Sequence, residues 1–279
     1  MTDLQKAVIA IIEYDYDTAF KILSSMAKDG NASAQFYFGY MCFNGFGFVP
    51  NEKEATKLRS SAIKIFKEQA ENGDKEAISK LGRILADGSQ LDNTNFLEEL
   101  KWLKLASGNG CREASFMLGN IYNTGHKIND TDDSDFFPII NKKEAFKWFK
   151  ISAEQGMGFG MINVASFLKN GTGIDKDFKE AFKWYNISFL SYKKMVNYRF
   201  ADVWEYEVIP GIKDHIREIK KTLKSTEIFE IVKIANEYVR QKTNEGVFDY
   251  SNKDDLDEFL DFINNDNGFE WTLSKTDNI

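Results

Sequence analysis

Apolar and polar positions follow a helical period along most of the chain. In five segments, two neighbouring apolar residues come three and four positions after a mostly alanine position, a spacing that places all three on one side of a helix. The alanine position is held by Ala19, Ala62, Glu99, Ala145 and Ala181. The apolar pairs are Ile22 and Leu23, Ile65 and Phe66, Trp102 and Leu103, Trp148 and Phe149, and Trp184 and Tyr185. With only three prolines in the chain, this pattern predicts an all-α fold.

Glycines recur at fixed distances after four of these stripes. The first glycines are Gly30, Gly73, Gly110 and Gly156. Nine residues later come Gly39, Gly82, Gly119 and Ala165, and six further on come Gly45, Gly88, Gly125 and Gly171. Such a repeat predicts helix, glycine turn, helix, with the first glycine in a left-handed conformation and the third ending the second helix. The second glycine lies inside a helix, where it costs about 1 kcal/mol relative to alanine, so it predicts close packing of paired helices.

Two repeats carry extra residues. After Pro50 no helix breaker occurs before the next turn, so we expect the first helix of that repeat to be about two turns longer than the others. In the repeat that ends near Gly171, the extra segment HKINDTDDSDFFPIINK is rich in Asp and predicts a loop.

At these residues the sequence resembles the Sel-one-like repeat family, relatives of the tetratricopeptide repeats. The resemblance rests on the pattern A-x-x-W/F-x-x-x-A-x-x-G-x-x-x-A-x-x-x-L-G-x-x-Y-x-x-G, most complete in EAFKWFKISAEQG and NGCREASFMLGNIYNTG, and it covers roughly Asp15 to Leu190. It implies a right-handed α-solenoid of helix-turn-helix repeats whose members bind and bridge other proteins. Glu99 and Ala165 depart from the family pattern.

The remaining sequence predicts C-terminal capping helices, because a solenoid leaves its last apolar face bare. One helix is predicted in STEIFEIVKIANEYVRQ, capped by Ser225 or Thr226. A preceding helical piece is expected to break near Pro210 and Gly211. A last short helix is predicted in DDLDEFLDFINN. We therefore divide the chain into a repeat region of about five helix pairs (1–190), capping helices (191–248) and an acidic segment (249–279).

Charge and composition narrow the functional classes. The net charge of −7 lies wholly in residues 249–279, which hold nine acidic residues against two lysines. A neutral body with an acidic end argues against nucleic-acid binding and favours a basic protein partner. No stretch is long and apolar enough to span a membrane, and residues 1–17 do not form a secretory signal. Cys42 and Cys111 form no disulfide framework. We therefore expect a cytoplasmic protein.

Candidate chemistry is sparse in the sequence. His126 and His215 lie in different regions of the sequence, and the familiar metal, nucleophile and phosphate-loop motifs are lacking. The pattern S-x-x-K occurs four times, as expected by chance in a chain rich in Ser and Lys, and does not indicate a nucleophile. We expect no catalytic residue, cofactor or metal. The opposing hypothesis, an enzyme, predicts a polar pocket around one of the two histidines.

Lysines recur two residues after the alanine position, at Lys21, Lys64, Lys101, Lys147 and Lys183. Stacked repeats would present them as a row, which suits either a groove for an acidic segment or an ordinary solvated face. The candidate partner-binding residues are Lys101, Lys104, Lys147, Lys150, Phe136, Phe137, Asp254, Asp255, Asp257, Glu258 and Asp261.

These features favour a non-catalytic scaffold or adaptor that binds another protein. The alternative is a bacterial immunity protein that binds and neutralises a basic toxin, suggested by the acidic C-terminal segment and by the Asp-rich loop. The oligomeric state is not set by the sequence pattern.

Overall fold

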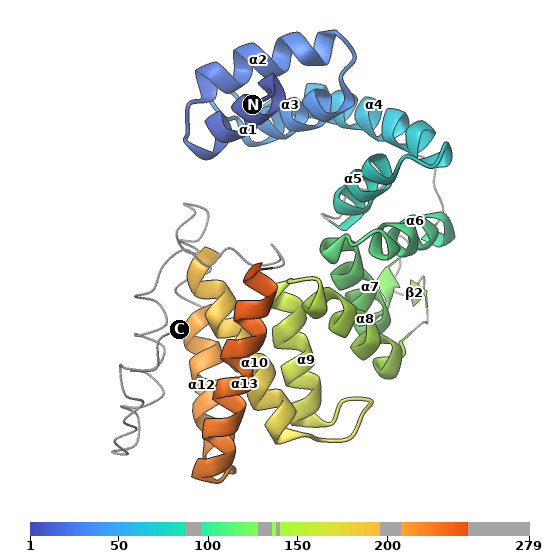
Figure 1. Ribbon diagram of the computed structural model, residues 1–279. Helices are drawn as coiled ribbons and strands as arrows, with labels where there is room; N and C mark the ends of the chain where they lie inside the picture. The colour runs from blue at the N-terminus through green and yellow to red at the C-terminus, as the bar shows by residue number, and fades with distance from the viewer. Residues whose placement is uncertain (87–95, 128–135, 138–139, 196–207, 245–279) are drawn as a thin grey trace. The chain divides into compact units, whose positions relative to one another are not determined.

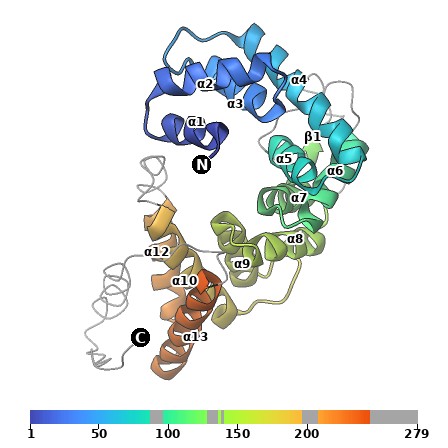
Figure 2. The same ribbon diagram turned by 45° about the horizontal axis from the view of Figure 1, so that its top comes forward.

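The computed structural model describes residues 1–86, 96–127, 136–137, 140–195 and 208–244, and the fold within them is an all-α solenoid of helix pairs (Figures 1 and 2). Two compact units, Met1–Gln155 and Gly156–Ile279, divide the chain. Seven of the helices predicted from the apolar stripes and their glycines form the body of the first unit, and an additional helix precedes them.

The elements of the first unit are α1 (Asp3–Ile12), α2 (Tyr16–Lys28), α3 (Ala32–Asn44), α4 (Glu52–Glu71), α5 (Lys75–Ala86), α6 (Phe96–Gly108), α7 (Arg112–Thr124), β1 (His126–Lys127), β2 (Phe136–Phe137) and α8 (Lys142–Glu154). Those of the second unit are α9 (Gly158–Asn170), α10 (Phe178–Met195), α12 (Val208–Lys220) and α13 (Ser225–Asn244). The division at residues 190 and 248 stays a prediction, and α10 continues past residue 190.

The first glycine of each repeat ends the first helix in a left-handed conformation, as predicted. The φ angles are 83° at Gly30, 87° at Gly73, 87° at Gly110 and 89° at Gly156. At Gly30 the amide donates to the Ala27 carbonyl, and the next amide, that of Asn31, donates to the Met26 carbonyl. This pair of bonds is the Schellman motif, and it satisfies carbonyls that the helix end leaves without partners.

The third glycine of the repeat ends the second helix. Gly45, Gly125 and Gly171 follow α3, α7 and α9, and all three have positive φ. The corresponding Gly88 lies outside the described residues.

The second glycine brings neighbouring helices together. A Cβ at Gly39 in α3 would lie 2.9 Å from the Arg59 side chain and 3.1 Å from the Ala55 carbonyl oxygen, both in α4. A Cβ at Gly119 in α7 would collide with the Phe149 ring of α8. The predicted close packing is therefore present, and it joins the second helix of one repeat to the first helix of the next.

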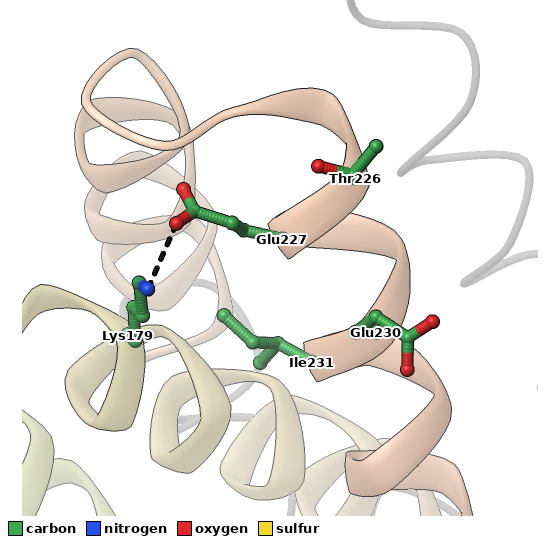
Figure 3. Close-up of a pocket in the computed structure, with 5 residues that line it drawn as sticks. All are labelled: Lys179, Thr226, Glu227, Glu230 and Ile231. Carbon is green, nitrogen blue, oxygen red and sulfur yellow. Dashed lines mark ion pairs between the residues drawn. The ribbon is translucent and has the colours of Figure 1, made fainter.

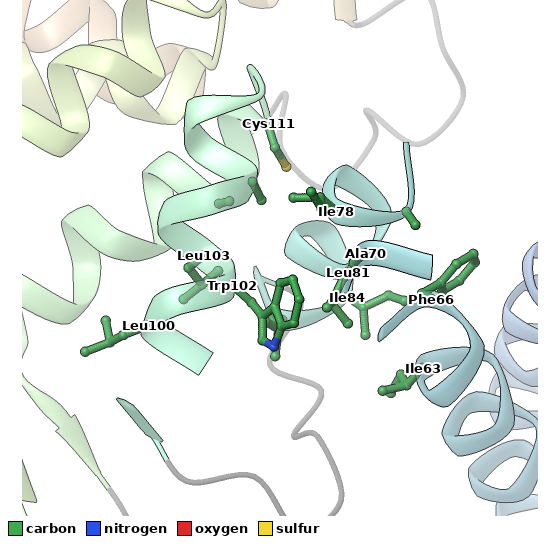
Figure 4. Close-up of a cluster of buried hydrophobic side chains, with 14 of the residues drawn as sticks. Ile63, Phe66, Ala70, Ile78, Leu81, Ile84, Leu100, Trp102, Leu103 and Cys111 are labelled. Carbon is green, nitrogen blue, oxygen red and sulfur yellow. The ribbon is translucent and has the colours of Figure 1, made fainter. Parts of the chain in front are cut away.

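The core of the first unit is built from the predicted stripe. Side chains from α4, α5 and α6, among them Phe66, Leu81 and Trp102, gather between these helices (Figure 4). The second residue of each apolar pair is buried at all five repeats. Burying such side chains stabilises the fold by about 1.5–3 kcal/mol each, so the stacking of repeats carries most of the stability.

The two inserted segments behave differently. Helix α4 has 20 residues where α2, α6 and α8 each have 13, which confirms the predicted two extra turns. The Asp-rich segment was expected to be a loop throughout, and here the prediction was incomplete. His126 and Lys127 pair with Phe137 and Phe136 in a short antiparallel ladder. Four paired residues are too few to give an alternating pattern that the sequence could reveal.

The second unit is organised around α10, which packs against α9, α12 and α13. Its side chains Phe182, Tyr185 and Phe189 are fully buried. Within the same unit the predicted stripe of α13 faces the core: Ile228, Ile231, Val232, Ala235 and Val239 are all buried.

Two local predictions in this unit were wrong by small margins. Ser225 is the first residue of α13, so the helix starts one residue earlier than a Ser225 cap would give. Glu227 accepts a hydrogen bond from the Lys224 amide at 2.9 Å, which stabilises that start. Pro210 and Gly211 lie in the first turn of α12 and do not break it, since a proline in the first turn removes no helical hydrogen bond. The predicted short helix in DDLDEFLDFINN lies outside the described residues.

Candidate protein-interaction surface

The predicted row of lysines exists on the first unit. Lys21 of α2, Lys64 of α4, Lys101 of α6 and Lys147 of α8 occupy the same place in successive first helices, and all four are exposed. Each lies beside the buried stripe that anchors its helix, and the stripe fixes the direction in which it points. We call these four residues the lysine row.

The charges of the lysine row are compensated to different degrees. The Lys147 ammonium lies 2.9 Å from the Glu144 carboxylate, one helical turn earlier. Lys101 lies over the Trp102 ring at 5.5 Å from its centroid. No ion pair to another described residue involves Lys21 or Lys64. The row is therefore positive at its α2 and α4 end and partly neutralised at α8.

A second position, three residues after the lysine row, is held by lysine in three repeats, at Lys67, Lys104 and Lys150. Lys104 and Lys150 are exposed, and the Lys104 ammonium lies 6.0 Å from the Tyr122 ring centroid. Lys67 instead forms an ion pair with Glu98 at 2.5 Å, which ties α4 to α6 and lowers the pKa of the Glu98 carboxyl. This position thus contributes both exposed charge and a contact between repeats.

The fifth repeat does not continue the row in the same form. Lys183 of α10 is half-buried and lies 2.6 Å from Glu180. Three residues later, at the second position, stands the fully buried Asn186. The exposed row consequently belongs to the first unit.

The other predicted site residues are only partly placed. Phe136 and Phe137 form β2, whose backbone pairs with β1. The acidic candidates Asp254, Asp255, Asp257, Glu258 and Asp261 lie outside the described residues. Their role in partner binding stays a prediction.

Sequence reasoning missed a set of exposed apolar side chains near the start of the chain. The exposed residues are Tyr14, Phe20, Tyr40, Phe43 and Val49. Phe20 makes edge contacts with the Phe38 and Phe48 rings, at 5.5 and 5.6 Å between centroids. In a segment this rich in aromatic residues, the period shows which positions belong to a helix but not which of them face outward. Grouped exposed apolar residues are typical of surfaces that bind other proteins.

His215 is the histidine that the structure places among other polar side chains. Its Nδ1 lies 3.1 Å from the Lys169 ammonium, and its ring stacks on Tyr185 with centroids 5.0 Å apart. Burial, followed by the nearby Lys169 charge, lowers the pKa of His215. Lys169 is also paired with Glu218. The neutral imidazole accepts a hydrogen bond from Lys169 and stacks on the buried Tyr185 ring, so it joins α9, α10 and α12. In this arrangement it does not present a free base to a substrate.

An open hollow lies between α10 and α13 (Figure 3). It has a volume of about 260 Å³ and is lined by Lys179, Thr226, Glu227, Glu230 and Ile231. Lys179 and Glu227 form an ion pair at 2.8 Å across it. The pair raises the pKa of Lys179 and lowers the pKa of Glu227, so both side chains stay charged. The lysine is therefore committed to a structural pair.

Both cysteines are buried and free. Burial raises the pKa of the Cys42 thiol and of the Cys111 thiol, which disfavours the reactive thiolate.

Among the residues with described positions, no three His, Cys, Asp or Glu side chains gather as a metal site requires. None of the described helices is both long and apolar enough to cross a membrane.

Comparison with known proteins agrees with this architecture. The Sel1 repeat family matches residues 32–64, 112–157 and 158–188. The first residue of each match is the first residue of α3, α7 or α9, so each match covers a second helix and continues into the helix that follows it. No curated protein matches the chain.

Two solved structures resemble this chain over most of its length. One is a protective antigen of uropathogenic Escherichia coli described as displaying an SLR fold, with 18% identity, a TM-score of 0.49, and coverage of 82% of this chain and 50% of that one. The other is a Sel1 repeat protein from Oxalobacter formigenes, with 18% identity, a TM-score of 0.47, and coverage of 85% and 88%. The chain thus spans half the length of the first structure.

The family matches fall on the helices whose glycines and apolar stripes define the repeat. The three matched segments, the left-handed glycine turns and the helix-to-helix glycine contacts describe one recurring unit. These three segments of the chain are Sel1-like repeats.

Proposed function

We propose that this chain is a non-catalytic interaction module that binds an acidic segment of a partner protein through the lysine row. The three Sel1 repeats suggest a protein-interaction scaffold. The observation that carries the proposal is the exposure of Lys21, Lys64, Lys101 and Lys147 at one repeated helix position.

The physical basis is the addition of weak charges along a rigid support. A single exposed ion pair contributes about 0–1 kcal/mol, so one lysine would not select a partner. Four lysines held by stacked repeats can meet an extended acidic segment together, and they also attract it from a distance. The pairing of Lys147 with Glu144 reduces the attraction at one end, so Lys21 and Lys64 contribute most.

A matched pair of variants tests the proposal. One variant changes the four lysines of the row to glutamate, and the other changes Lys28, Lys53, Lys75 and Lys143, which are also exposed, to glutamate. Both change the net charge equally. Affinity capture from the native host's lysate with quantitative mass spectrometry should show at least a tenfold loss of the main partner in the first variant only. Equal loss in both variants, or retention in both, would contradict the proposal.

The alternative proposal is a cytoplasmic immunity protein of bacteria that uses its acidic segment to bind and neutralise a basic toxin. Its support is the acidic composition of residues 249–279 together with two free, buried cysteines that suit a reducing compartment. A bait ending at Val247 separates the two proposals. A single stoichiometric partner that is lost on truncation would favour the dedicated inhibitor, and partners that are retained would favour the scaffold.

A further inference from the structure

Asparagine followed by glycine is a chemically labile pair that recurs at helix ends in this chain. The glycine amide nitrogen can attack the side-chain carbonyl carbon of the asparagine, and glycine has no side chain to hinder the approach. The pairs among the described residues are Asn44–Gly45, Asn72–Gly73, Asn109–Gly110 and Asn170–Gly171, and Asn267–Gly268 lies outside them. All four described asparagines are exposed.

The folded chain restrains the reaction, because the attacking nitrogen is a hydrogen-bond donor at the helix end. The Gly73 amide donates to the Ala70 carbonyl at 3.0 Å, and the Gly110 amide donates to the Ser107 carbonyl at 3.0 Å. Attack requires the glycine amide to leave its carbonyl, so the rate in the folded chain follows the local opening of the turn. The pairs should therefore differ in rate where their helix ends differ in stability.

The Asn109 side chain is the least restrained of the four. The side-chain amides of Asn44 and Asn72 each donate at 2.9 Å to a backbone carbonyl one turn earlier, and that of Asn170 donates to a serine hydroxyl at 3.3 Å. These bonds hold the side chain back along the helix, away from the following glycine. Asn109 forms no side-chain hydrogen bond within the part of the chain that the structure describes.

The end of α6 also opens more easily than the end of α4. Gly108 is the last residue of α6, where α4 has Glu71, and a glycine weakens the helix end. The Ser107 carbonyl also accepts a hydrogen bond from the Gln155 side chain at 3.1 Å. It therefore keeps a partner when the Gly110 amide leaves, which lowers the cost of opening this turn.

We propose that Asn109–Gly110 is a site of spontaneous isoaspartate formation, and that this modification loosens the turn between α6 and α7. The Gly110 nitrogen bonds to Cγ of Asn109 and gives up its proton, while the side-chain nitrogen takes up a proton and leaves as ammonia. Water then opens the cyclic imide. Attack on the former backbone carbonyl gives isoaspartate, and attack on the former side-chain carbonyl gives aspartate. The proposal is independent of the lysine row.

Isoaspartate cannot close this turn as asparagine does. It routes the backbone through the side-chain methylene, which inserts one more carbon before the next amide. The bonds from the Gly110 amide to the Ser107 carbonyl and from the Cys111 amide to the Ala106 carbonyl, both 3.0 Å, can then no longer form together. The modification also leaves a carboxylate at the C-terminus of α6, where the helix dipole disfavours negative charge.

Tryptic peptides report two matched sites separately. Asn109 is the one asparagine in the peptide Leu105–Arg112, and Asn72 is the one asparagine in the peptide Glu68–Lys75. In the folded full chain at neutral pH, mass spectrometry should show conversion at Asn109 about fivefold faster than at Asn72. In denaturant the two rates should become similar, because the fold no longer restrains either site. Equal rates in the folded chain, faster conversion at Asn72, or no conversion at Asn109 would overturn the proposal.

Gly108→Ala tests the reason for the difference. A Cβ at Gly108 meets no atom within 4 Å, so the substitution strengthens the end of α6 without a clash. It should slow conversion at Asn109 about fivefold and leave conversion at Asn72 unchanged. An unchanged rate at Asn109 would contradict opening of this helix end as the controlling step.

Asn109→Gln tests the consequence of the modification. Glutamine holds this place in the fourth repeat, as Gln155, so folding should be preserved, and circular dichroism verifies it. Its side chain would have to close a larger ring, which is much slower. After the same incubation, the urea midpoint should fall in the unaltered chain and in the control Asn72→Gln, but not in Asn109→Gln. An equal fall in Asn109→Gln would overturn the loosening of this turn by isoaspartate.

Discussion

Phe149 of α8 lies against the backbone of Gly119 in α7, so closely that a side-chain carbon at position 119 would collide with the ring. The same relationship joins Gly39 of α3 to the Arg59 side chain of α4. A glycine in a helix costs about 1 kcal/mol relative to alanine, and the contact with the following repeat offsets that cost. The repeating glycine is thus a requirement of stacking.

Gly119→Ala should destabilise the fold. The new methyl group forces the Phe149 ring from its place, and overpacking of this kind costs about 1–3 kcal/mol. Urea unfolding followed by circular dichroism measures the change. The matched control is Gly108→Ala, because a Cβ at that position in α6 meets no atom within 4 Å. An equal loss of unfolding free energy in Gly108→Ala would show that the effect of Gly119→Ala comes from helix propensity and not from the contact with Phe149.

Gly73→Ala tests the turn separately from packing. A Cβ at Gly73 also meets nothing within 4 Å, but the residue has a φ of 87°, where an L-amino acid is strained by about 1–2 kcal/mol. We therefore expect a loss of about 1 kcal/mol in the free energy of unfolding, between that of Gly119→Ala and that of Gly108→Ala. No loss relative to Gly108→Ala would mean that the turn relaxes to another conformation.

The repeat architecture was predictable because its signals are local and recur. The glycine offsets gave the left-handed turns at Gly30, Gly73, Gly110 and Gly156, and the absence of a breaker after Pro50 gave the length of α4. The stripe of α13 was found from its period alone. Each of these features follows from helix geometry within one segment.

The remaining features depend on contacts between segments. The pairing of β1 with β2 joins residues on either side of the Asp-rich stretch, and two residues per strand give no periodic signal. The exposure of Tyr40 and Phe43 depends on which side of α3 the neighbouring helices cover. The lysine row was predicted as a pattern, but its pairing with Glu144 and its contact with Trp102 required the structure.

The two thiols should react slowly in the folded chain. Both Cys42 and Cys111 are buried, and burial raises the pKa of each thiol, so little thiolate is present at pH 7–8. Titration with a coloured disulfide reagent should show slow reaction in buffer and rapid reaction of two thiols in denaturant. Rapid reaction of either thiol in buffer would contradict the packing around it.

His215 should make stability depend on pH. Burial and the Lys169 charge lower the pKa of His215 in the folded chain, so the unfolded chain takes up the proton first as pH falls. The contribution of His215 is complete above about pH 6.5 and decreases as pH falls through the folded-state pKa. Unfolding free energies between pH 8 and 5 should therefore fall less steeply in His215→Gln.

His126→Gln serves as the control, since the chain has only two histidines. Proton NMR of that variant follows His215 alone. Lys169→Met should move the pKa of His215 upward, because it removes a positive charge 3.1 Å from the ring. A pKa at or above 6.5 in the otherwise unaltered chain would contradict the described packing.

Lysine accessibility in the presence and absence of the bound partner tests binding through the lysine row. Brief acetylation of the free chain and of the chain captured from the host's lysate, followed by mass spectrometry, reports each lysine separately. Binding through the lysine row predicts several-fold protection of Lys21, Lys64, Lys101 and Lys147, with Lys28, Lys53, Lys75 and Lys143 unchanged. Equal modification of the lysine row in the free and bound chain would rule out binding through these residues.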